Sequence, residues 1–327
     1  MISKREATTT MGRRKVLHAM GATVVVLGCG VEGGAQDEGS SEGDGEGSGD
    51  ASASSGSEAS SSGSGSSDGA DGSSDATGTP QGCEAASAWA SGGTASMTAK
   101  DCYPDPFAAG VSACALLCET TEGPCTADTI ERQDVSEGWS GLPVRLSLKI
   151  VTADTCEPVE GAFVEIWHTQ RTGVYSGETP SGMMCYGDDP DAVNYLYFRG
   201  SQTTDANGRV DFDTCYPGWY SSRAVHIHFR VIVGSDEFLT SQLFFDDALS
   251  AEIFAEHPEY AEFGQPDTTN DTDNVIGGEA DKTPYVLETQ RMADGAMLAS
   301  KVIAVRSSPD DALCSAQGAG GGGAGGP

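Results

Sequence analysis

The sequence is short of positive charge and of long apolar runs. It has 18 Lys and Arg against 49 Asp and Glu, which gives a formal net charge of −31 at pH 7. Such a chain gains nothing from counterion release on a phosphate backbone, which excludes nucleic acid as a partner, and anionic membrane surfaces repel it. No apolar run reaches the roughly 18 residues that a membrane-spanning helix needs. Histidines are also few, only five, so two that lie close together in sequence are informative.

The first 29 residues have the features of an export signal rather than of a fold. Arg13 and Arg14 precede an apolar stretch, Ala22–Leu27, that is too short to span a bilayer. Twin arginines before such a stretch resemble a bacterial twin-arginine export signal. The stretch ends at Cys29 in a sequence similar to a lipobox, although an ordinary signal peptide cleaved elsewhere is the alternative. We therefore expect an exported protein of the cell envelope, on its periplasmic or surface face, with a lipid at Cys29 as its only membrane contact.

Residues 30–80 are almost wholly Gly, Ser, Ala, Asp and Glu, with no aromatic residue and no Lys or Arg. Such a segment cannot bury enough apolar surface to offset its ordering entropy, so we expect a disordered, self-repelling tether. The Gly-rich residues 317–327 are expected to be a disordered tail. Between them lie a Cys-rich segment, residues 81–125, and a folded domain, residues 126–316.

Ten cysteines are too many for an ordinary cytosolic protein and indicate an oxidising compartment. If Cys29 carries lipid, nine remain, and an odd number requires at least one free thiol or one intermolecular bridge. Five of the nine lie between Cys83 and Cys125, where regular periodicity is weak, so this segment is expected to depend on disulfides. Cys114 and Cys118 have no His near them in sequence, which favours structural bridges over a metal site.

Beyond Pro143, apolar and polar residues alternate with the period of two that a half-buried strand shows. Turn residues at Pro158–Gly161 and Asn207–Gly208 separate such stretches. Strands are expected at 144–150, 163–167, 210–213, 224–233, 238–245 and 301–306, and one helical stretch at 249–261, which His257-Pro258 interrupts. Short strands, frequent turns and no long helix predict an all-β fold: a β-sandwich of mostly antiparallel strands with few short helices, preceded by the disordered tether.

Two histidines lie in the strand expected at 224–233. Residues i and i+2 of a strand point to one face, so His226 and His228 project together while Ile227 faces the other way. Two imidazoles directed into one space form half of a metal site. On spacing alone, two solvent-facing or structurally hydrogen-bonded histidines are the alternative.

A series of short motifs runs in a fixed order around this pair. They are Thr121–Pro124, Gly161–His168, Gly173–Ser176, Phe198–Asp205, Tyr216–Tyr220, the His-Ile-His pair, Leu239–Leu243 and Asp267–Asn270. This ordered set, which covers roughly Thr121 to Asp273, resembles the intradiol ring-cleavage dioxygenases, and most closely their secreted, protocatechuate-dioxygenase-like branch.

The resemblance implies one non-haem ferric ion, Fe(III), held by two tyrosines and two histidines. The tyrosine of the family's Gly-x-Tyr-Ser motif matches Tyr175, that of its Pro-Gly-x-Tyr motif matches Tyr220, and its histidine pair matches His226 and His228. Ferric iron is a hard acid and phenolate a hard anionic donor, and a bound cation strongly lowers the pKa of a coordinating hydroxyl. Two phenolates and a hydroxide would neutralise the charge of the ion. Only motif position separates Tyr175 and Tyr220 from the other tyrosines of the domain, most of which are expected to be packing residues.

The reaction that the resemblance implies joins a catecholic substrate with dioxygen. In the family a catechol binds the iron through both oxygens and displaces one tyrosine and the hydroxide, which take up its protons. The ring then opens between the two hydroxylated carbons to a muconate-type diacid that carries both atoms of dioxygen. Arg223 and Gln242 match active-site residues: Arg223 would stabilise developing negative charge, and Gln242 would hydrogen-bond substrate or product oxygens.

Some features of the sequence limit or compete with this interpretation. Only two residues separate Tyr220 from Arg223, fewer than in the protocatechuate and catechol enzymes, and this predicts a more open pocket. The Pro158–Ala162 turn also occurs in prealbumin-like surface modules, so a non-enzymatic β-sandwich that binds aromatics or a partner protein is one alternative, and an inactive relative is another. We expect Trp167 in the core, and His168 and His257 at the surface or beside the site.

Overall fold

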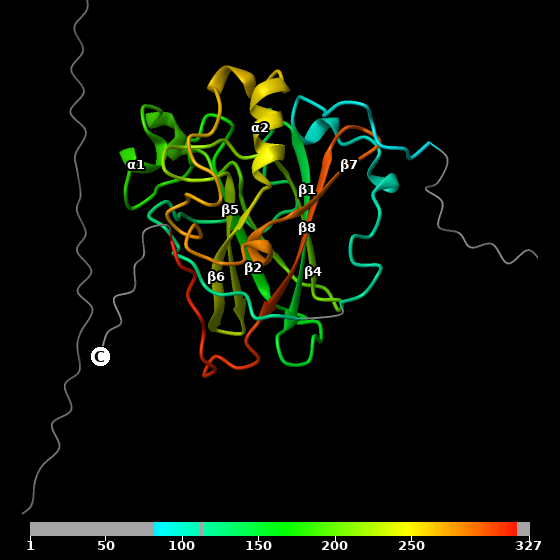
Figure 1. Ribbon diagram of the computed structural model, residues 1–327, viewed down its shortest axis with the longest axis vertical. Coiled ribbons are helices and arrows are strands. Elements are labelled where there is room, and N and C mark those ends of the chain that lie inside the picture. The colour runs from blue at the N-terminus through cyan, green and yellow to red at the C-terminus, as the bar shows by residue number, and fades with distance from the viewer. Residues whose placement is uncertain (1–81, 112–113, 319–327) are drawn as a thin grey trace, which may run out of the picture. The chain divides into compact units, whose positions relative to one another are not determined.

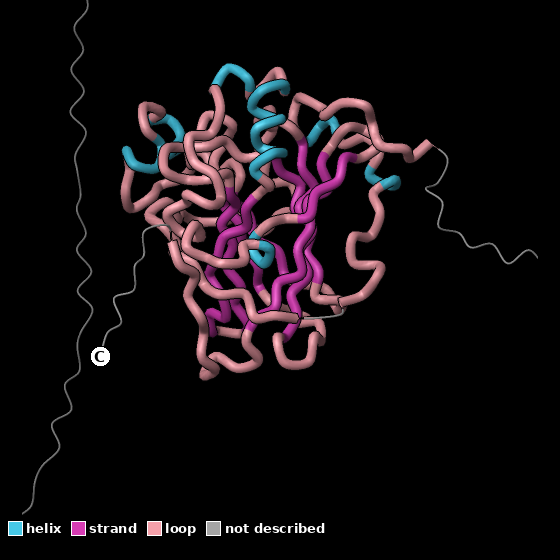
Figure 2. Tube along the Cα trace, in the orientation of Figure 1, coloured by secondary structure: helices cyan, strands magenta, loops and turns pink. Residues whose placement is uncertain are grey.

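The computed structural model describes residues 82–111 and 114–318. The expected export signal, the lipidated Cys29 and the expected tether lie outside the described residues, as do residues 319–327 of the expected tail. Within the described part, strands occupy the centre and loops surround them, with helices confined to short pieces at the periphery (Figure 2).

In the part of the chain that the structure describes, eight strands form two four-stranded sheets (Figure 1). One sheet has the order β4-β1-β8-β7 and the other the order β3-β2-β5-β6. The strands are β1 Pro143–Thr152, β2 Phe163–Trp167, β3 Arg199–Thr203, β4 Arg209–Cys215, β5 His226–Val233, β6 Asp236–Phe244, β7 Glu288–Arg291 and β8 Met297–Val305. Only β1 and β8 pair in parallel; the other neighbours are antiparallel. The predicted all-β sandwich is confirmed.

The helices are short. They are α1 Met183–Tyr186, α2 Asp247–Glu256 and the 3-10 turns Thr94–Ser96, Lys100–Cys102, Pro190–Asn194, Ala261–Phe263 and Thr283–Tyr285. The Asp246 side chain caps α2 by accepting a hydrogen bond from the Leu249 amide at 3.0 Å, as N-cap aspartates do. The helix ends before His257-Pro258, earlier than the expected stretch at 249–261. Among the helices of the described residues, none combines the length and the hydropathy needed to cross a membrane.

The core lies between the two sheets and takes alternate residues from each strand. Leu146 and Leu148 of β1 and Ile227 and Phe229 of β5 are fully buried in it, and burial of such side chains stabilises the fold by about 2 kcal/mol each. The intervening residues of β5 point to the opposite face of its sheet, where loops cover them instead of water. That face carries the candidate site.

The Cys-rich segment packs onto the sandwich. Leu116 forms a parallel bridge with Ala304, Glu119 forms another with Ser315, and Leu117 is buried in the core. Four disulfides join Cys83 to Cys102, Cys114 to Cys156, Cys118 to Cys314 and Cys125 to Cys185. The prediction that Cys114 and Cys118 form structural bridges is confirmed. Cys215 is the one free cysteine of the described residues, and it is buried.

Two strands were not predicted from the sequence, because neither has an alternating apolar pattern. β3 reads Arg-Gly-Ser-Gln-Thr and β7 reads Glu-Thr-Gln-Arg. β7 pairs only with β8 at the edge of its sheet, where one face meets solvent. β3 also lies at an edge, yet Arg199 and Ser201 are buried because loops cover them.

His168 and His257 are buried, so of the two positions expected for them, at the surface or beside the site, the surface is wrong. His257 is 4% exposed and His168 is fully buried. The His168 ring stacks on Phe198, its Nδ1 lies 2.8 Å from the Thr169 carbonyl oxygen, and its Nε2 lies 2.7 Å from Thr214 Oγ1. Burial lowers the pKa of His168 from 6.5 to about 3, so the imidazole is neutral in the folded state.

His168 therefore makes stability depend on pH. The pKa of His168 is lower in the folded than in the unfolded state. The contribution of this group to the free energy of unfolding is therefore complete above pH 6.5 and is lost as the pH falls towards 3. Between pH 7 and pH 5 this loss amounts to about 2 kcal/mol. In the His168→Gln variant, which has no titrating group there, the unfolding free energy measured in urea should fall by about 2 kcal/mol less over this interval. Equal pH dependence in the two proteins would contradict the prediction.

Candidate metal centre

The two histidines of β5 lie side by side on the face of the sheet that turns away from the core. In the strand register His226 is opposite Phe244, and His228 is opposite Gln242 on one side and Trp167 on the other. The two Nε2 atoms are 3.1 Å apart, and both side chains are buried. Trp167 is buried as expected but lies on this outer face, where its ring stacks on His228 with centroids 4.9 Å apart.

The loop after β2 brings Tyr175 to the same place. Gly173 opens its Gly-x-Tyr-Ser motif with φ +81°, and a Cβ there would lie 2.3 Å from the Trp219 carbonyl oxygen. Glycine is therefore needed for this loop to pack against the segment that carries Tyr220. Tyr175 is 2% exposed.

A tight turn places Tyr220 beside Arg223. The Arg223 amide donates to the Tyr220 carbonyl at 3.2 Å, and Ser222 has φ +69°, an uncommon conformation for a residue with a Cβ. Asp267 stabilises the turn by accepting hydrogen bonds from the Ser221 hydroxyl at 2.8 Å and the Ser222 amide at 3.2 Å. The two-residue spacing seen in the sequence thus presents the phenol and the guanidinium side by side.

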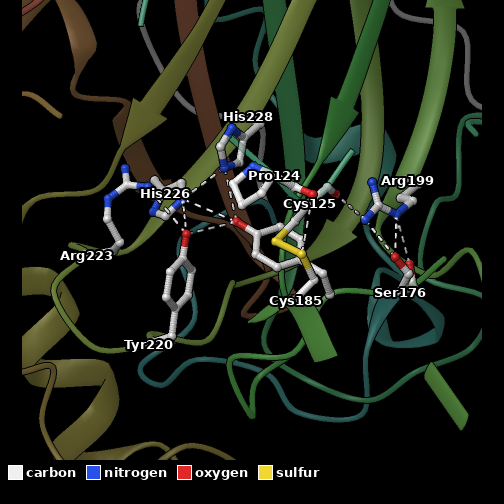
Figure 3. The surroundings of a disulfide bond; sticks show 10 residues. Pro124, Cys125, Ser176, Cys185, Arg199, Tyr220, Arg223, His226 and His228 are labelled. Carbon is white, nitrogen blue, oxygen red and sulfur yellow. Dashed lines mark hydrogen bonds between the residues drawn. A yellow bond between two sulfur atoms is a disulfide. The ribbon is translucent and has the colours of Figure 1, made fainter. Parts of the chain in front are cut away.

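The structure brings all four residues predicted as metal ligands together: Tyr175, Tyr220, His226 and His228. Figure 3 labels the last three of them. Five separations among the two phenol oxygens and the two Nε2 atoms lie between 3.1 and 3.4 Å. Tyr175 Oη and His226 Nε2 form one triangle of such sides with Tyr220 Oη and another with His228 Nε2. A point equidistant from the corners of either triangle lies about 2 Å from them, the usual length of a bond from nitrogen or oxygen to a transition metal. The donors therefore fit a single ion.

The protonation of the histidines also fits a cation. His226 Nδ1 lies 2.6 Å from the Ala224 carbonyl oxygen, so Nδ1 carries the proton and the Nε2 lone pair faces the other donors. Burial, and then the charge of Arg223, hold the pKa of both His226 and His228 well below 6.5. Both imidazoles are thus neutral, the form that binds metals.

The phenols complete the donor set. Burial raises the pKa of Tyr175 well above 10, so this group ionises near neutral pH only when a bound cation lowers its pKa. In the described part of the chain no cluster of three or more His, Cys, Asp and Glu residues could hold a metal. A metal at this place would therefore depend on the tyrosines.

Arg223 lies at the edge of this centre and is held on three sides. Its Nη1 donates to Tyr220 Oη at 3.4 Å, its Nε donates to Asp273 Oδ2 at 2.9 Å, and its Nη2 donates to Gln242 Oε1. Gln242 is fully buried, and its amide nitrogen donates to the Thr121 carbonyl at 2.7 Å. Both amide atoms of Gln242 have protein partners, so Gln242 helps to position Arg223, and the substrate contact expected from the sequence stays a prediction.

Three residues of the centre escaped the sequence analysis. Asp273 is fully buried and accepts hydrogen bonds from Arg223 and from the backbone amides of Ala224 and Val275. Gly123 passes so close to His228 that a Cβ would lie 3.3 Å from its Cε1. Arg199 is buried behind Tyr175, with its guanidinium carbon 5.9 Å from the centroid of that ring. Gly123 and Arg199 stand in quoted motifs, but nothing in the sequence ties them, or Asp273, to this place.

Comparisons with known proteins agree with the geometry. Residues 120–274 match the family described as dioxygenase. A solved structure, an intradiol ring-cleavage dioxygenase from Tetranychus urticae, is 27% identical and superposes with a TM-score of 0.51 over 61% of this chain and 96% of its own.

Two curated relatives match a shorter stretch. Catechol 1,2-dioxygenase 1 of Acinetobacter lwoffii is 29% identical over 147 residues, which are 38% of this chain and 44% of that protein. Chlorocatechol 1,2-dioxygenase of Pseudomonas putida is 28% identical over 114 residues, 29% of this chain and 40% of that protein. The chain thus spans less than half the length of the curated relatives it matches.

Proposed function

Because residues 120–274 belong to the intradiol ring-cleavage dioxygenase family, we propose that this protein is a non-haem ferric dioxygenase that cleaves catecholic rings. The ring opens between its two hydroxylated carbons, and both atoms of dioxygen enter a muconate-type diacid. The observation that carries the proposal is the convergence of two phenol oxygens and two imidazole nitrogens, five of whose separations lie between 3.1 and 3.4 Å.

Tyr175, Tyr220, His226 and His228 would hold the ferric ion. Bound there, the ion would supply the chemistry that a catechol ring needs in order to react with dioxygen without an external reductant. The protein contributes two ionisable phenols to balance the charge of the ion and two neutral imidazoles whose orientation is fixed. Phenolate donors stabilise the ferric over the ferrous state, because they are hard and anionic.

The two tyrosines differ in a way that suits proton transfer. Tyr175 is buried, whereas Tyr220 is half-buried and its Oη accepts a hydrogen bond from Arg223 Nη1. A catechol must lose its phenolic protons before it reacts, and Tyr220 Oη is the accessible phenol oxygen that can take one. The Arg223 guanidinium, fixed by Asp273 and Gln242, is placed to stabilise negative charge that develops beside it.

We also propose that the protein works in the cell envelope, attached by a lipid at Cys29. The twin-arginine and lipobox-like sequences support this location, and so do the four disulfides, which form and persist in oxidising compartments.

The visible absorption of the purified full chain tests the function. A broad phenolate-to-iron charge-transfer band is expected, which changes when catechol is added in air and returns when the catechol has been consumed. Removal of the iron by a chelator should abolish both the band and the oxygen uptake, and ferric salt should restore them. A band that shifts but never returns would indicate a binder or an inactive relative. A chain that stays colourless after loading with ferric salt would leave the non-enzymatic sandwich module as the explanation.

A further inference from the structure

Arg199, the first residue of β3, is a buried cation with an unusual set of partners. Its exposed fraction is 1%, and no carboxylate oxygen of the described residues lies within 4 Å of it. Burial lowers the pKa of Arg199 to about 10, so the group remains charged at neutral pH. A buried charge is costly unless hydrogen bonds or another charge compensate it, so its place here requires an explanation.

The partners of Arg199 are the Ser176 hydroxyl and backbone carbonyls of two segments beside the metal centre (Figure 3). Nη2 donates to the carbonyl oxygens of Cys125 and Ser176, both at 2.6 Å, and Nε donates to the Ser176 carbonyl at 2.9 Å. Ser176 directly follows Tyr175, and Cys125 ends the segment whose Gly123 lies against His228. One guanidinium thus ties the loop that carries a phenol donor to the segment that covers a histidine donor.

A disulfide joins the same two segments a second time. Cys125 is bonded to Cys185 of α1, with Cα atoms 5.4 Å apart, and the Cys185 carbonyl accepts the backbone amide of Tyr175 at 2.8 Å. Both cysteines pack with Tyr175 and Trp167 in one buried cluster. Tyr175 is therefore held on one side through Ser176 and Arg199 and on the other through Cys185 and the disulfide. Tyr220 is only half-buried: it packs against this cluster, and its side-chain hydrogen-bonding partners among the described residues are Arg223, Tyr175 and His226.

From this geometry we infer that Arg199 and the Cys125–Cys185 disulfide are positioning residues that hold Tyr175 in place as a fixed donor to the metal. The inference rests on the proposed function, since it concerns the same centre. It adds that the affinity of the centre for iron depends on two groups that do not touch the metal, one of them a covalent bond that exists only under oxidising conditions.

The charge of Arg199 gives this role a spectroscopic signature. Figure 3 shows Arg199 and Ser176 on the far side of the disulfide from His226 and Tyr220. The guanidinium carbon lies 5.9 Å from the centroid of the Tyr175 ring, on the side away from those other donors. A cation in this position stabilises an electron on the phenolate more than on the iron, so it raises the energy of the charge-transfer transition from Tyr175.

The test compares three variants of the full chain, each loaded with ferric salt. Cys125→Ser/Cys185→Ser and Arg199→Gln are each expected to lower the affinity for iron, measured by competition with a chelator, by tenfold to a hundredfold, as loss of groups that orient metal ligands commonly does. Arg199→Gln should also move the charge-transfer band to longer wavelength. Arg199→Lys, which keeps the charge but not the forked donors, should lose affinity with a smaller shift of the band.

Cys114→Ser/Cys156→Ser is the matched control, because it removes a disulfide at the turn after β1, in the other sheet. It should leave the iron affinity and the band unchanged. Wild-type affinity in Cys125→Ser/Cys185→Ser, or equal losses in the two disulfide variants, would overturn the inference. If Arg199→Gln does not fold, the iron affinities of Arg199→Lys and of the two disulfide variants test the inference instead. A wild-type chain that binds no iron would refute the proposed function instead, so the two failures are distinguishable.

Discussion

Tyr220→Phe is expected to lower the turnover of catechol by about 10³-fold, a loss of the size that removal of a positioned proton acceptor causes. The substitution removes one oxygen that faces His226 Nε2 at 3.2 Å and accepts from Arg223. It changes little else, because the ring is only half-buried and the turn at Ser221–Ser222 depends on Asp267 and the backbone. Oxygen uptake with catechol measures the loss, and the visible spectrum should lose the contribution of one phenolate.

Tyr195→Phe is the control for this prediction. Tyr195 is 44% exposed and packs edge-on against Trp139 outside the metal centre, so its replacement should leave turnover and spectrum as in the wild type. The thermal midpoints of both variants should remain within a few degrees of the parent. An unchanged spectrum in Tyr220→Phe would remove Tyr220 from the set of ligands.

Asp273→Asn is expected to destabilise the folded protein by about 3 kcal/mol and to lower turnover as well. The carboxylate is fully buried, forms an ion pair with Arg223 at 2.9 Å, and accepts hydrogen bonds from three backbone amides. Removal of one partner from a buried pair leaves an uncompensated charge, at a cost of about 3–5 kcal/mol. Arg223 would also lose the contact that fixes its guanidinium beside Tyr220. Denaturation in urea measures the first effect and oxygen uptake the second.

Asp271→Asn, two residues away, controls for the chemistry of the substitution. The Asp271 side chain is 84% exposed and pairs with Lys282 at 3.0 Å, an arrangement that contributes at most about 1 kcal/mol. Its replacement should leave turnover unchanged. If the two variants lose equal stability, Asp273 does not compensate Arg223 in the way that we describe.

The parts of the centre that follow from local patterns could be predicted from the sequence. The strand period of two placed His226 and His228 on one face, and the structure agrees. Tyr175 and Tyr220 could be separated from the other tyrosines only by their positions in motifs that resemble a family, because their convergence depends on two loops far apart in sequence, one after β2 and one between β4 and β5. The sandwich itself followed from alternation in β1, β2, β4, β5 and β6.

The remaining features depend on contacts between residues far apart in sequence. Asp273 lies 50 residues from Arg223, and Arg199 lies 74 residues from Cys125, and no local pattern marks either pair. Cysteine pairing cannot be deduced from sequence alone, so the bond between Cys125 and Cys185 was not predicted. The sequence left His168 and His257 either at the surface or beside the site, because the loops that cover them have no periodic pattern.

The parallel pairing of β1 with β8 governs the order in which the domain can form. β1 lies inside its sheet between β4 and β8, and its register pairs Val144 with Met297. A ribosome must therefore add more than 150 residues after Val144 before the second neighbour of β1 exists. The Cys118–Cys314 bond, with a sequence separation of 196, closes a similarly long loop. Contacts of such long range slow folding, and until β8 arrives one edge of β1 stays open to pairing with other chains.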